Sequence, residues 1–210
     1  MANITRLLPP VERAYAAVRF TIMRPKILSV LDLMLPDRGR ILDVGCGFGL
    51  FAAYFGQTHP RRAITGIDPA ARRVAIAQRM AQRLGLAGHT FREGKVEATD
   101  LGGPYAAVYM LDVMHHLPSH EQSPVLERLK TALEPRGLLL IKEITTEPRA
   151  GLRFTKLLDQ LMVGWDEPLS YRHHDEWAGI LVGMGFEVRM VRIPDVLPYP
   201  HVVIAARRLD

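Results

Sequence analysis

Residues 41–50 read Ile-Leu-Asp-Val-Gly-Cys-Gly-Phe-Gly-Leu, a short apolar run that leads directly into a glycine-rich loop. The apolar residues predict a buried strand, and residues 50–55 predict the beginning of a helix. Glycines between a strand and a helix permit a tight turn and a close approach of a ligand to the backbone. The free N–H groups of the helix would face the same ligand. The stretch therefore predicts a nucleotide-type site at the carboxyl end of a strand in an α/β sheet.

Strand and helix patterns alternate on the carboxyl side of this loop. Strands are expected at residues 63–67, 89–93, 105–111 and 138–141, with helices at 70–84 and 119–133, then a helix at 175–184 and strands at 187–193 and 201–206. A capping box formed by Ser119 and Gln122 is expected to begin the helix after the fourth strand. Such alternation predicts right-handed crossovers and a parallel sheet with helices on both faces.

The chain divides into four expected parts of one domain. Residues 1–36 are expected to be an N-terminal helical cap, 37–144 a cofactor-binding core, 145–175 a helical insertion that forms part of the acceptor pocket, and 176–210 a closing helix with two strands. In the cap, helices are expected around Pro9-Pro10 and after Arg24-Pro25 because of an apolar spacing. The residues at that spacing in the first half are Ile4, Leu7, Leu8, Val11, Tyr15 and Val18.

The composition indicates a globular protein. With 210 residues, 48% hydrophobic and 23% charged, the chain fits one domain with a full core. No apolar run is long enough to span a bilayer, and the N-terminus lacks a signal-peptide pattern. The single cysteine excludes an internal disulfide. These three observations lead us to expect a cytoplasmic location. The net charge of +5 favours an anionic partner. Because the arginines are spread along the chain, a solvated basic surface is an equal alternative.

Three positions distinguish between nucleotide ligands. The NAD fingerprint requires a glycine where Leu50 stands. Asp43, just before the loop, would repel a pyrophosphate but attract the ammonium group of an amino acid. Asp68 ends the second strand and can accept hydrogen bonds from ribose hydroxyls, a feature that NAD enzymes share. Asp43 and Leu50 therefore favour a cofactor that carries an amino acid.

Four motifs in the right order carry a family resemblance. Residues 41–50 resemble the first motif of class I S-adenosylmethionine-dependent methyltransferases of the small-molecule type, and residues 66–68 resemble their second. Residues 109–118 and 133–140 are similar to the segments around their fourth and fifth strands. The resemblance implies an α/β, Rossmann-like three-layer sandwich with a mostly parallel seven-stranded sheet and a C-terminal antiparallel hairpin. It also implies S-adenosylmethionine as the cofactor and S-adenosylhomocysteine as a product.

The resemblance assigns a role to each residue of the cofactor site. At the methionine end, it implies that Asp43 and the carbonyl of Leu111 bind the ammonium group and that Gly45, Cys46 and Gly47 line the chain. It implies that Asp68 binds the ribose and that Pro69, Lys95 and Val96 surround the adenine. Many relatives have an acidic residue at position 95 that accepts a hydrogen bond from the adenine, and a lysine cannot accept one. Cys46 is read as a small loop residue in preference to a reactive thiol.

Candidate catalytic residues follow the fourth and fifth strands. Methyl transfer is a direct displacement, so positioning supplies much of the rate, and a base is needed only if the acceptor must lose a proton. His115 or His116 is the candidate base; the alternative is that they support the cofactor loop. Glu143 faces either the acceptor or a surface arginine. No metal is expected at His173-His174, because no acidic or cysteine partner has ligand spacing and adjacent side chains diverge.

The acceptor is expected to be a small molecule or an acyl-carrier-linked group methylated at O, N or C. The pocket would lie under Tyr15 and the segment 149–165, where Leu158, Met162 and Trp165 form a stripe that contacts the acceptor or packs in the core. An RNA or protein methyltransferase is an alternative that the basic charge favours. A nucleic-acid partner is not expected, since no basic block with aromatics and no Asn/Asp-Pro-Pro-Tyr motif occurs. A non-catalytic cofactor-binding scaffold is the third possibility, and the oligomeric state is open.

Overall fold

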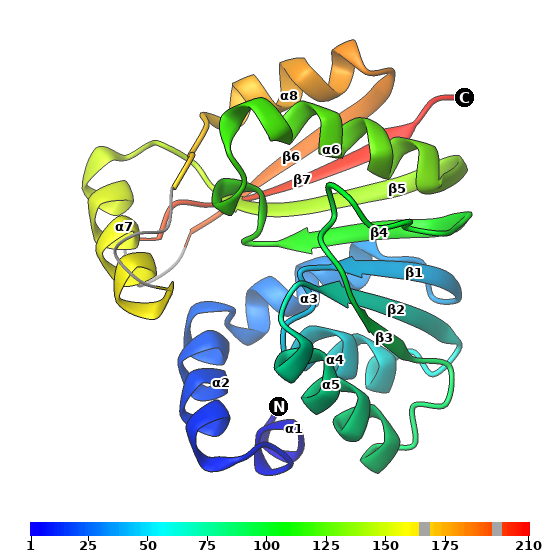
Figure 1. The fold of residues 1–210 in the computed structure, drawn as a ribbon. Helices are drawn as coiled ribbons and strands as arrows, with labels where there is room; N and C mark the ends of the chain where they lie inside the picture. Colours follow the sequence, from blue (N-terminus) through cyan, green and yellow to red (C-terminus); the bar gives the residue numbers. More distant parts are fainter. Residues whose placement is uncertain (164–168, 195–198) are drawn as a thin grey trace.

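A single twisted sheet forms the centre of the computed structural model (Figure 1). The structure describes residues 1–163, 169–194 and 199–210, and within them seven strands are ordered β3-β2-β1-β4-β5-β7-β6. The strands are β1 (Gly39–Val44), β2 (Arg62–Asp68), β3 (Thr90–Glu93), β4 (Tyr105–Leu111), β5 (Leu133–Ile144), β6 (Phe186–Ile193) and β7 (His201–Arg208). Among the described strands, β7 runs antiparallel to both of its neighbours, β5 and β6, and all other adjacent pairs are parallel. The predicted fold class, including the closing antiparallel pair, is confirmed.

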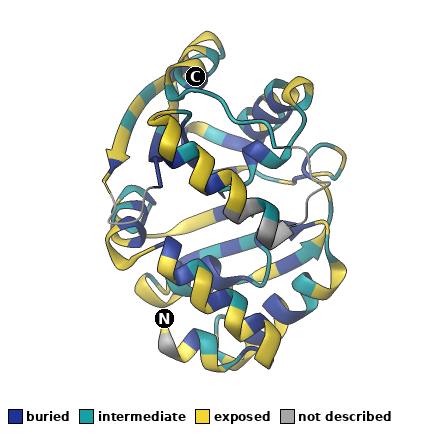
Figure 2. Ribbon diagram, turned by 90° about the vertical axis from the view of Figure 1, so that its left-hand side faces the viewer, coloured by how far each residue is buried: buried dark blue, intermediate teal, exposed yellow. Residues whose placement is uncertain are grey.

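Helices cover both faces of this sheet, and Figure 2 shows them buried toward the sheet and exposed on their outer sides. The helices are α1 (Ala2–Arg6), α2 (Pro10–Ile22), α3 (Pro25–Met34), α4 (Leu50–Thr58), α5 (Ala71–Arg83), the 3-10 turn η1 (Met114–His116), α6 (Ser119–Ala132), α7 (Arg149–Val163) and α8 (His174–Gly183). No described helix is long and apolar enough to cross a membrane.

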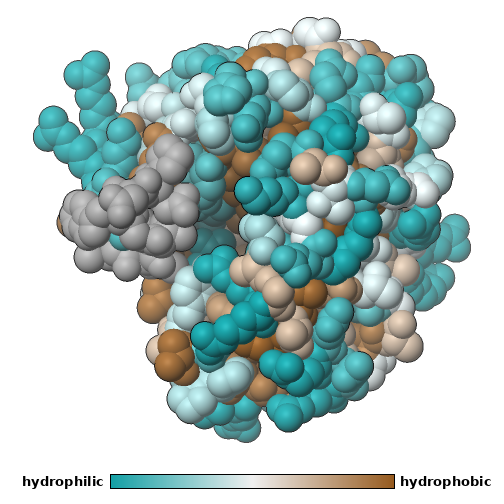
Figure 3. All heavy atoms as spheres, in the orientation of Figure 1, coloured by the Kyte–Doolittle hydropathy of each residue, from teal (hydrophilic) through white to brown (hydrophobic). Residues whose placement is uncertain are grey.

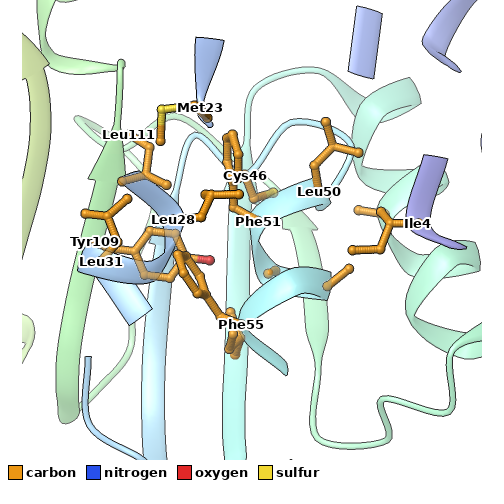
Figure 4. Packing of buried hydrophobic residues seen from close by; sticks show 14 of the residues in the cluster. Ile4, Met23, Leu28, Leu31, Cys46, Leu50, Phe51, Phe55, Tyr109 and Leu111 are labelled. Atoms are coloured by element: carbon orange, nitrogen blue, oxygen red, sulfur yellow. The ribbon is translucent and has the colours of Figure 1, made fainter. Parts of the chain in front are cut away.

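The alternation of side chains along the central strands builds two separate cores. On β1, Ile41 joins the core beneath the helices α1–α5, whereas Leu42 joins the core beneath α6 and α8. On β4, Tyr109 and Met110 divide between the two faces in the same way, as successive residues of a strand must. Figure 4 shows the first core, where Phe55 of α4 lies beside Tyr109.

Two local expectations are wrong, the apolar stripe through Val11 and Val18 and the capping box at Ser119 and Gln122. Val11 and Val18 are 76% and 42% exposed, because α2 buries the opposite side, which carries Glu12 and Phe20. No side chain caps the first turn of α6, whose N-cap is Pro118. The Gln122 side chain instead donates to the backbone carbonyls of three residues in neighbouring loops, Met114, Leu117 and Ser170. Its amide is therefore used to join two loops and not to close a capping box.

Candidate active site

A cleft of about 410 Å³ opens at the carboxyl ends of β1, β2 and β4. Seven of the nine cofactor residues expected from the sequence line it, namely Gly45, Gly47, Asp68, Pro69, Lys95, Val96 and Leu111. Asp43 and Cys46 are buried and do not line the cleft. The parallel strands explain this convergence, because their carboxyl ends meet at one edge of the sheet.

The glycine loop between β1 and α4 is fixed by its backbone. Gly45, Gly47 and Gly49 all have positive φ angles, of 74°, 52° and 73°. Residues other than glycine rarely adopt such angles. The N–H groups of Gly45 and Cys46 both donate to the carbonyl of Ile67, at 2.8 and 3.0 Å. A Cβ at position 45 would lie 2.5 Å from the Val113 side chain, whereas one at position 47 would meet nothing within 4 Å. Gly45 therefore serves the fold, and Gly47 leaves the cleft open.

Asp68 is held in one orientation at the end of β2. Its Oδ2 atom accepts the Gly47 N–H at 2.9 Å, and its Oδ1 atom accepts the Ala70 N–H at 2.9 Å. A carboxylate oxygen has two lone pairs, so each oxygen can accept one further hydrogen bond. The side chain thus couples the glycine loop to β2 and can still receive ligand hydroxyls.

Asp43 is a buried carboxylate directly before the glycine loop. Burial raises the pKa of Asp43 to about 7, and the Asp68 charge adds to the rise while the Tyr109 hydroxyl opposes it. The Oδ2 atom has no hydrogen-bond partner among the described residues, and such a buried oxygen gains much from a cation. Burial, together with the charges of Asp43 and Asp68, also raises the pKa of the Cys46 thiol. The thiol is therefore protonated at neutral pH, as a small loop residue would be.

Helix α2 adds charged and aromatic groups that sequence reasoning did not assign to the cofactor. Tyr15 and Arg19 line the cleft. An Arg19 guanidinium nitrogen lies 3.2 Å from Asp112 Oδ2, and the Lys142 ammonium also contacts Asp112. Although burial opposes ionisation, Lys142 and then Arg19 hold the pKa of Asp112 below its ordinary value. The spacing of Arg19, one helical turn after Tyr15, was the available signal.

The adenine end, as expected from the sequence, contains Lys95 and Val96, and both line the cleft. Val96 is buried and Lys95 is exposed. Glu97 lines the same cleft and was not predicted. It supplies, two positions after Lys95, the hydrogen-bond acceptor that a lysine lacks.

The three candidate catalytic residues occupy two different environments. His115 and Glu143 are 2% and 1% exposed, and Nδ1 of the histidine lies 2.6 Å from Oε2 of the glutamate. The other carboxylate oxygen accepts the N–H groups of Val113 and Met114 at 3.1 and 2.8 Å. Glu143 therefore holds the loop that follows β4. Of the three residues, His116 is the one that lines the cleft.

His116 is a neutral imidazole at physiological pH. Burial, with a contribution from the neighbouring His115, lowers the pKa of His116 to about 4. The two rings lie with centroids 4.2 Å apart, and Tyr171 stacks on His115 at 5.0 Å. A neutral ring in the cleft has a lone pair with which to accept a proton.

The histidine pair at the beginning of α8 converges, contrary to the expected divergence. The two rings are 4.0 Å apart, and Asp175 oxygens lie 3.4 Å from His173 and 3.8 Å from His174. Both rings already have hydrogen-bond partners, because His173 Nδ1 accepts the Asp175 N–H and His174 Nδ1 bonds the Thr145 hydroxyl. These bonds fix the beginning of α8 relative to the end of β5.

The expected acceptor segment is described only in part. Helix α7 covers Arg149–Val163, but the side chains of Leu158 and Met162, and all of Trp165, lie outside the described residues. Beyond it, the Arg172 guanidinium donates to the Gln122 side chain at 2.5 Å, and the Lys156 ammonium lies 5.6 Å from the centre of the Tyr171 ring. These contacts join α7 to the segment before α8, and that segment to α6.

Comparison with known proteins gives a family match. A model described as "Methyltransferase domain" matches residues 15–191. Ubiquinone biosynthesis O-methyltransferase of Paracidovorax citrulli is 29% identical over 133 residues, which are 62% of this chain and 54% of that protein. Ribosomal RNA small subunit methyltransferase C of Pasteurella multocida is 31% identical over 142 residues, 64% of this chain and 39% of that protein. The chain thus spans about half the length of these curated relatives or less.

A solved structure shows the same fold. Magnesium protoporphyrin IX methyltransferase of Synechocystis PCC 6803, with bound SAH, is 22% identical and superposes with a TM-score of 0.70. The superposition covers 96% of this chain and 88% of that chain.

Proposed function

This chain belongs to the methyltransferase domain family, and from that premise we propose that it transfers the methyl group of S-adenosylmethionine to a small-molecule acceptor. The observation that carries the proposal is the orientation of Asp68. Its carboxylate is fixed by Gly47 and Ala70 at the edge of the cleft, with lone pairs left for two ribose hydroxyls.

The remaining residues of the cleft fit the rest of this cofactor. Leu111 lines the cleft, and its carbonyl would bind the ammonium group. The unpartnered oxygen of Asp43, which is buried outside the cleft lining, would attract the same group directly or through water. The open space at Gly47 accommodates the methionine chain. Pro69, Val96 and Glu97 would enclose the adenine, with Glu97 as acceptor for its amino group.

When bound, S-adenosylmethionine supplies an electrophilic methyl group on a sulfonium. The chain must then align the acceptor with that methyl and exclude water. Tyr15 and Arg19 of α2 close one side of the cleft. We assign to His116 the role of accepting a proton from an acceptor O–H or N–H group. His115 and Glu143 are assigned the role of positioning the loop that carries His116.

A small molecule is the favoured acceptor class. Of the two curated relatives, one is named for O-methylation in ubiquinone biosynthesis and the other for methylation of ribosomal RNA. The sequence contains no Asn/Asp-Pro-Pro-Tyr motif after β4, where residues 112–118 read Asp-Val-Met-His-His-Leu-Pro, and this argues against a planar base as acceptor. An acyl-carrier-linked acceptor and a cytoplasmic location remain predictions from the sequence.

The first experiment is isothermal titration of S-adenosylmethionine into the whole chain. Asp68→Asn should weaken binding by about ten-fold or more, the cost of a hydrogen bond to a charged group. Asp100→Asn is the matched control, because this exposed carboxylate accepts, among the described residues, only the nearby Gly102 N–H. Cofactor binding should be unchanged in this variant. A wild-type chain that does not bind the cofactor would refute the proposal.

Turnover is tested separately with methyl-labelled cofactor. Incubation with a metabolite extract should yield a labelled product whose mass identifies the acceptor. Cofactor binding without transfer to an extract metabolite or to RNA would favour the cofactor-binding scaffold, and label in RNA would replace the small-molecule proposal.

A further inference from the structure

A second cavity of about 280 Å³ lies outside the cofactor cleft, between the α1–α2 turn and α5. Its floor is apolar and includes Leu8 and Met80, each 2% exposed. Four exposed arginines also line it, namely Arg6, Arg13, Arg79 and Arg83. Figure 3 shows hydrophilic side chains among apolar surface over α1 and α5. We call this site the arginine cavity.

The positive charge of the arginine cavity is not compensated by the described part of the chain. None of its four arginines forms a salt bridge among the described residues. Helix α5 contains no acidic residue in Ala71–Arg83. The one carboxylate of α2, Glu12, is in contact with Arg72. Four like charges around one small cavity repel one another, and a bound anion would remove that repulsion.

Two of the four guanidinium groups are already fixed in place. Arg13 donates to the backbone carbonyls of Arg6 and Leu8 at 3.3 and 3.1 Å, and Arg83 donates to the carbonyl of Leu7 at 3.4 Å. These bonds occupy few of the five N–H donors of each group. The donors that remain are pre-ordered, so a ligand that binds them loses less conformational entropy.

We propose that the arginine cavity binds a phosphoryl group. A phosphoryl group matches the planar fork of a guanidinium through paired hydrogen bonds, and several arginines are needed to neutralise its two charges. The apolar floor excludes water beneath the ligand and strengthens the attraction. Because Arg6 and Arg13 belong to α1 and α2 and Arg79 and Arg83 to α5, the bound group would join the helical cap to the core. Tyr15 and Arg19 on α2 would be held over the cofactor cleft by the same ligand.

The test is calorimetric titration of pyrophosphate into the whole chain at low ionic strength, with Arg79→Gln and Arg61→Gln as the matched pair. Arg79 lies on the cavity, whereas Arg61 is an exposed arginine before β2, and both substitutions remove one charge. Arg79→Gln should weaken pyrophosphate binding by about ten-fold, and Arg61→Gln should leave it nearly unchanged. Pyrophosphate should also raise the melting temperature of the wild type above that in chloride of equal ionic strength.

Two results would overturn the proposal. The first is no pyrophosphate binding, or equal weakening by the two substitutions, which would mean general attraction to a basic surface. The second is binding only to vesicles of phosphatidylcholine with phosphatidic acid, which would indicate a membrane surface in place of a small site. Binding of both pyrophosphate and such vesicles, with both weakened by Arg79→Gln, would support the site and identify a lipid headgroup as one source of the phosphoryl group.

Discussion

The two sides of the cleft are held together by different kinds of bond. The methyl-donor side, residues 43–49 and 66–70, is fixed by backbone N–H groups, which donate to the Ile67 carbonyl and to the Asp68 carboxylate at the end of β2. The acceptor side, residues 112–117, 143–145 and 169–174, is fixed by side chains such as Glu143, Gln122 and Arg172. Backbone bonds need only glycines and strand ends in the right order. Side-chain bonds can be changed by substitution, so the acceptor side is the one free to vary with substrate.

The largest effect is expected on the donor side, from alanine in place of Gly45. A non-glycine residue at a positive φ costs about 1–2 kcal/mol, and the new Cβ would lie 2.5 Å from Val113, which adds overpacking. We expect Gly45→Ala to lower the free energy of unfolding by about 3 kcal/mol and to abolish cofactor binding. Urea denaturation and titration calorimetry measure the two effects.

Gly47→Ala is the matched control for that change. Its φ is also positive, but a Cβ there meets nothing within 4 Å and projects into open space. We expect only the backbone strain of about 1–2 kcal/mol, together with loss of cofactor binding because the methyl group takes the cofactor's place. If Gly47→Ala binds the cofactor normally, the cofactor does not lie against this loop.

The next effect is on the acceptor side, from His116→Gln. If His116 accepts the acceptor's proton, its loss should lower kcat by roughly 10²-fold or more while changing the KM for the cofactor little. The pKa of about 4 for this ring keeps it neutral above pH 5, so it should add no acid limb to the rate of the wild type between pH 6 and 8. A limb near pH 6.5 that disappears in His116→Gln would show that the ring titrates as an ordinary histidine.

The difference between backbone bonds and side-chain bonds also explains which parts of the site could be predicted from the sequence. Strand β4 was predicted with its bounds of Tyr105–Leu111, and the glycine loop was found because its residues are adjacent in the chain. The contacts of Arg19 with Asp112 and of Gln122 with Ser170 could not be predicted, because these partners lie far away in sequence and are met only after folding. Lys142 is the intermediate case. The sequence places the charged residue Lys142 directly after the apolar run 138–141, but it does not show that Asp112 is its ion-pair partner.

A smaller effect is expected from Glu143→Gln. Glutamine keeps one oxygen for the N–H groups of Val113 and Met114 but loses the charged bond to His115. We expect the free energy of unfolding to fall by about 2 kcal/mol, the cost of a hydrogen bond to a charged group. The measurement is the urea midpoint at unchanged slope. Glu147→Gln, at an exposed carboxylate three residues after β5 ends, should change stability by less than about 0.5 kcal/mol.

The smallest effect concerns Asp43, the buried donor-side carboxylate whose pKa is raised. In the ligand-free chain its pKa is about 7, so at pH 6 the carboxyl is mostly protonated. A bound ammonium favours the ionised form, and cofactor binding at pH 6 should release nearly one proton, whereas binding at pH 8.5 should release almost none. Titration calorimetry in buffers with different ionisation enthalpies measures this release, and Asp43→Asn should abolish it.

If Asp43 is the group that releases the proton, the free energy of unfolding must also depend on pH through the pKa of Asp43. The folded-state pKa of Asp43 is raised above the unfolded value of 3.8, so the stability it contributes is fully present below pH 3.8 and is lost as pH rises through about 7. Ligand-free Asp43→Asn should therefore be more stable than the wild type at pH 8, and the advantage should shrink toward pH 5. Proton release without this difference in stability would assign the titration to another group.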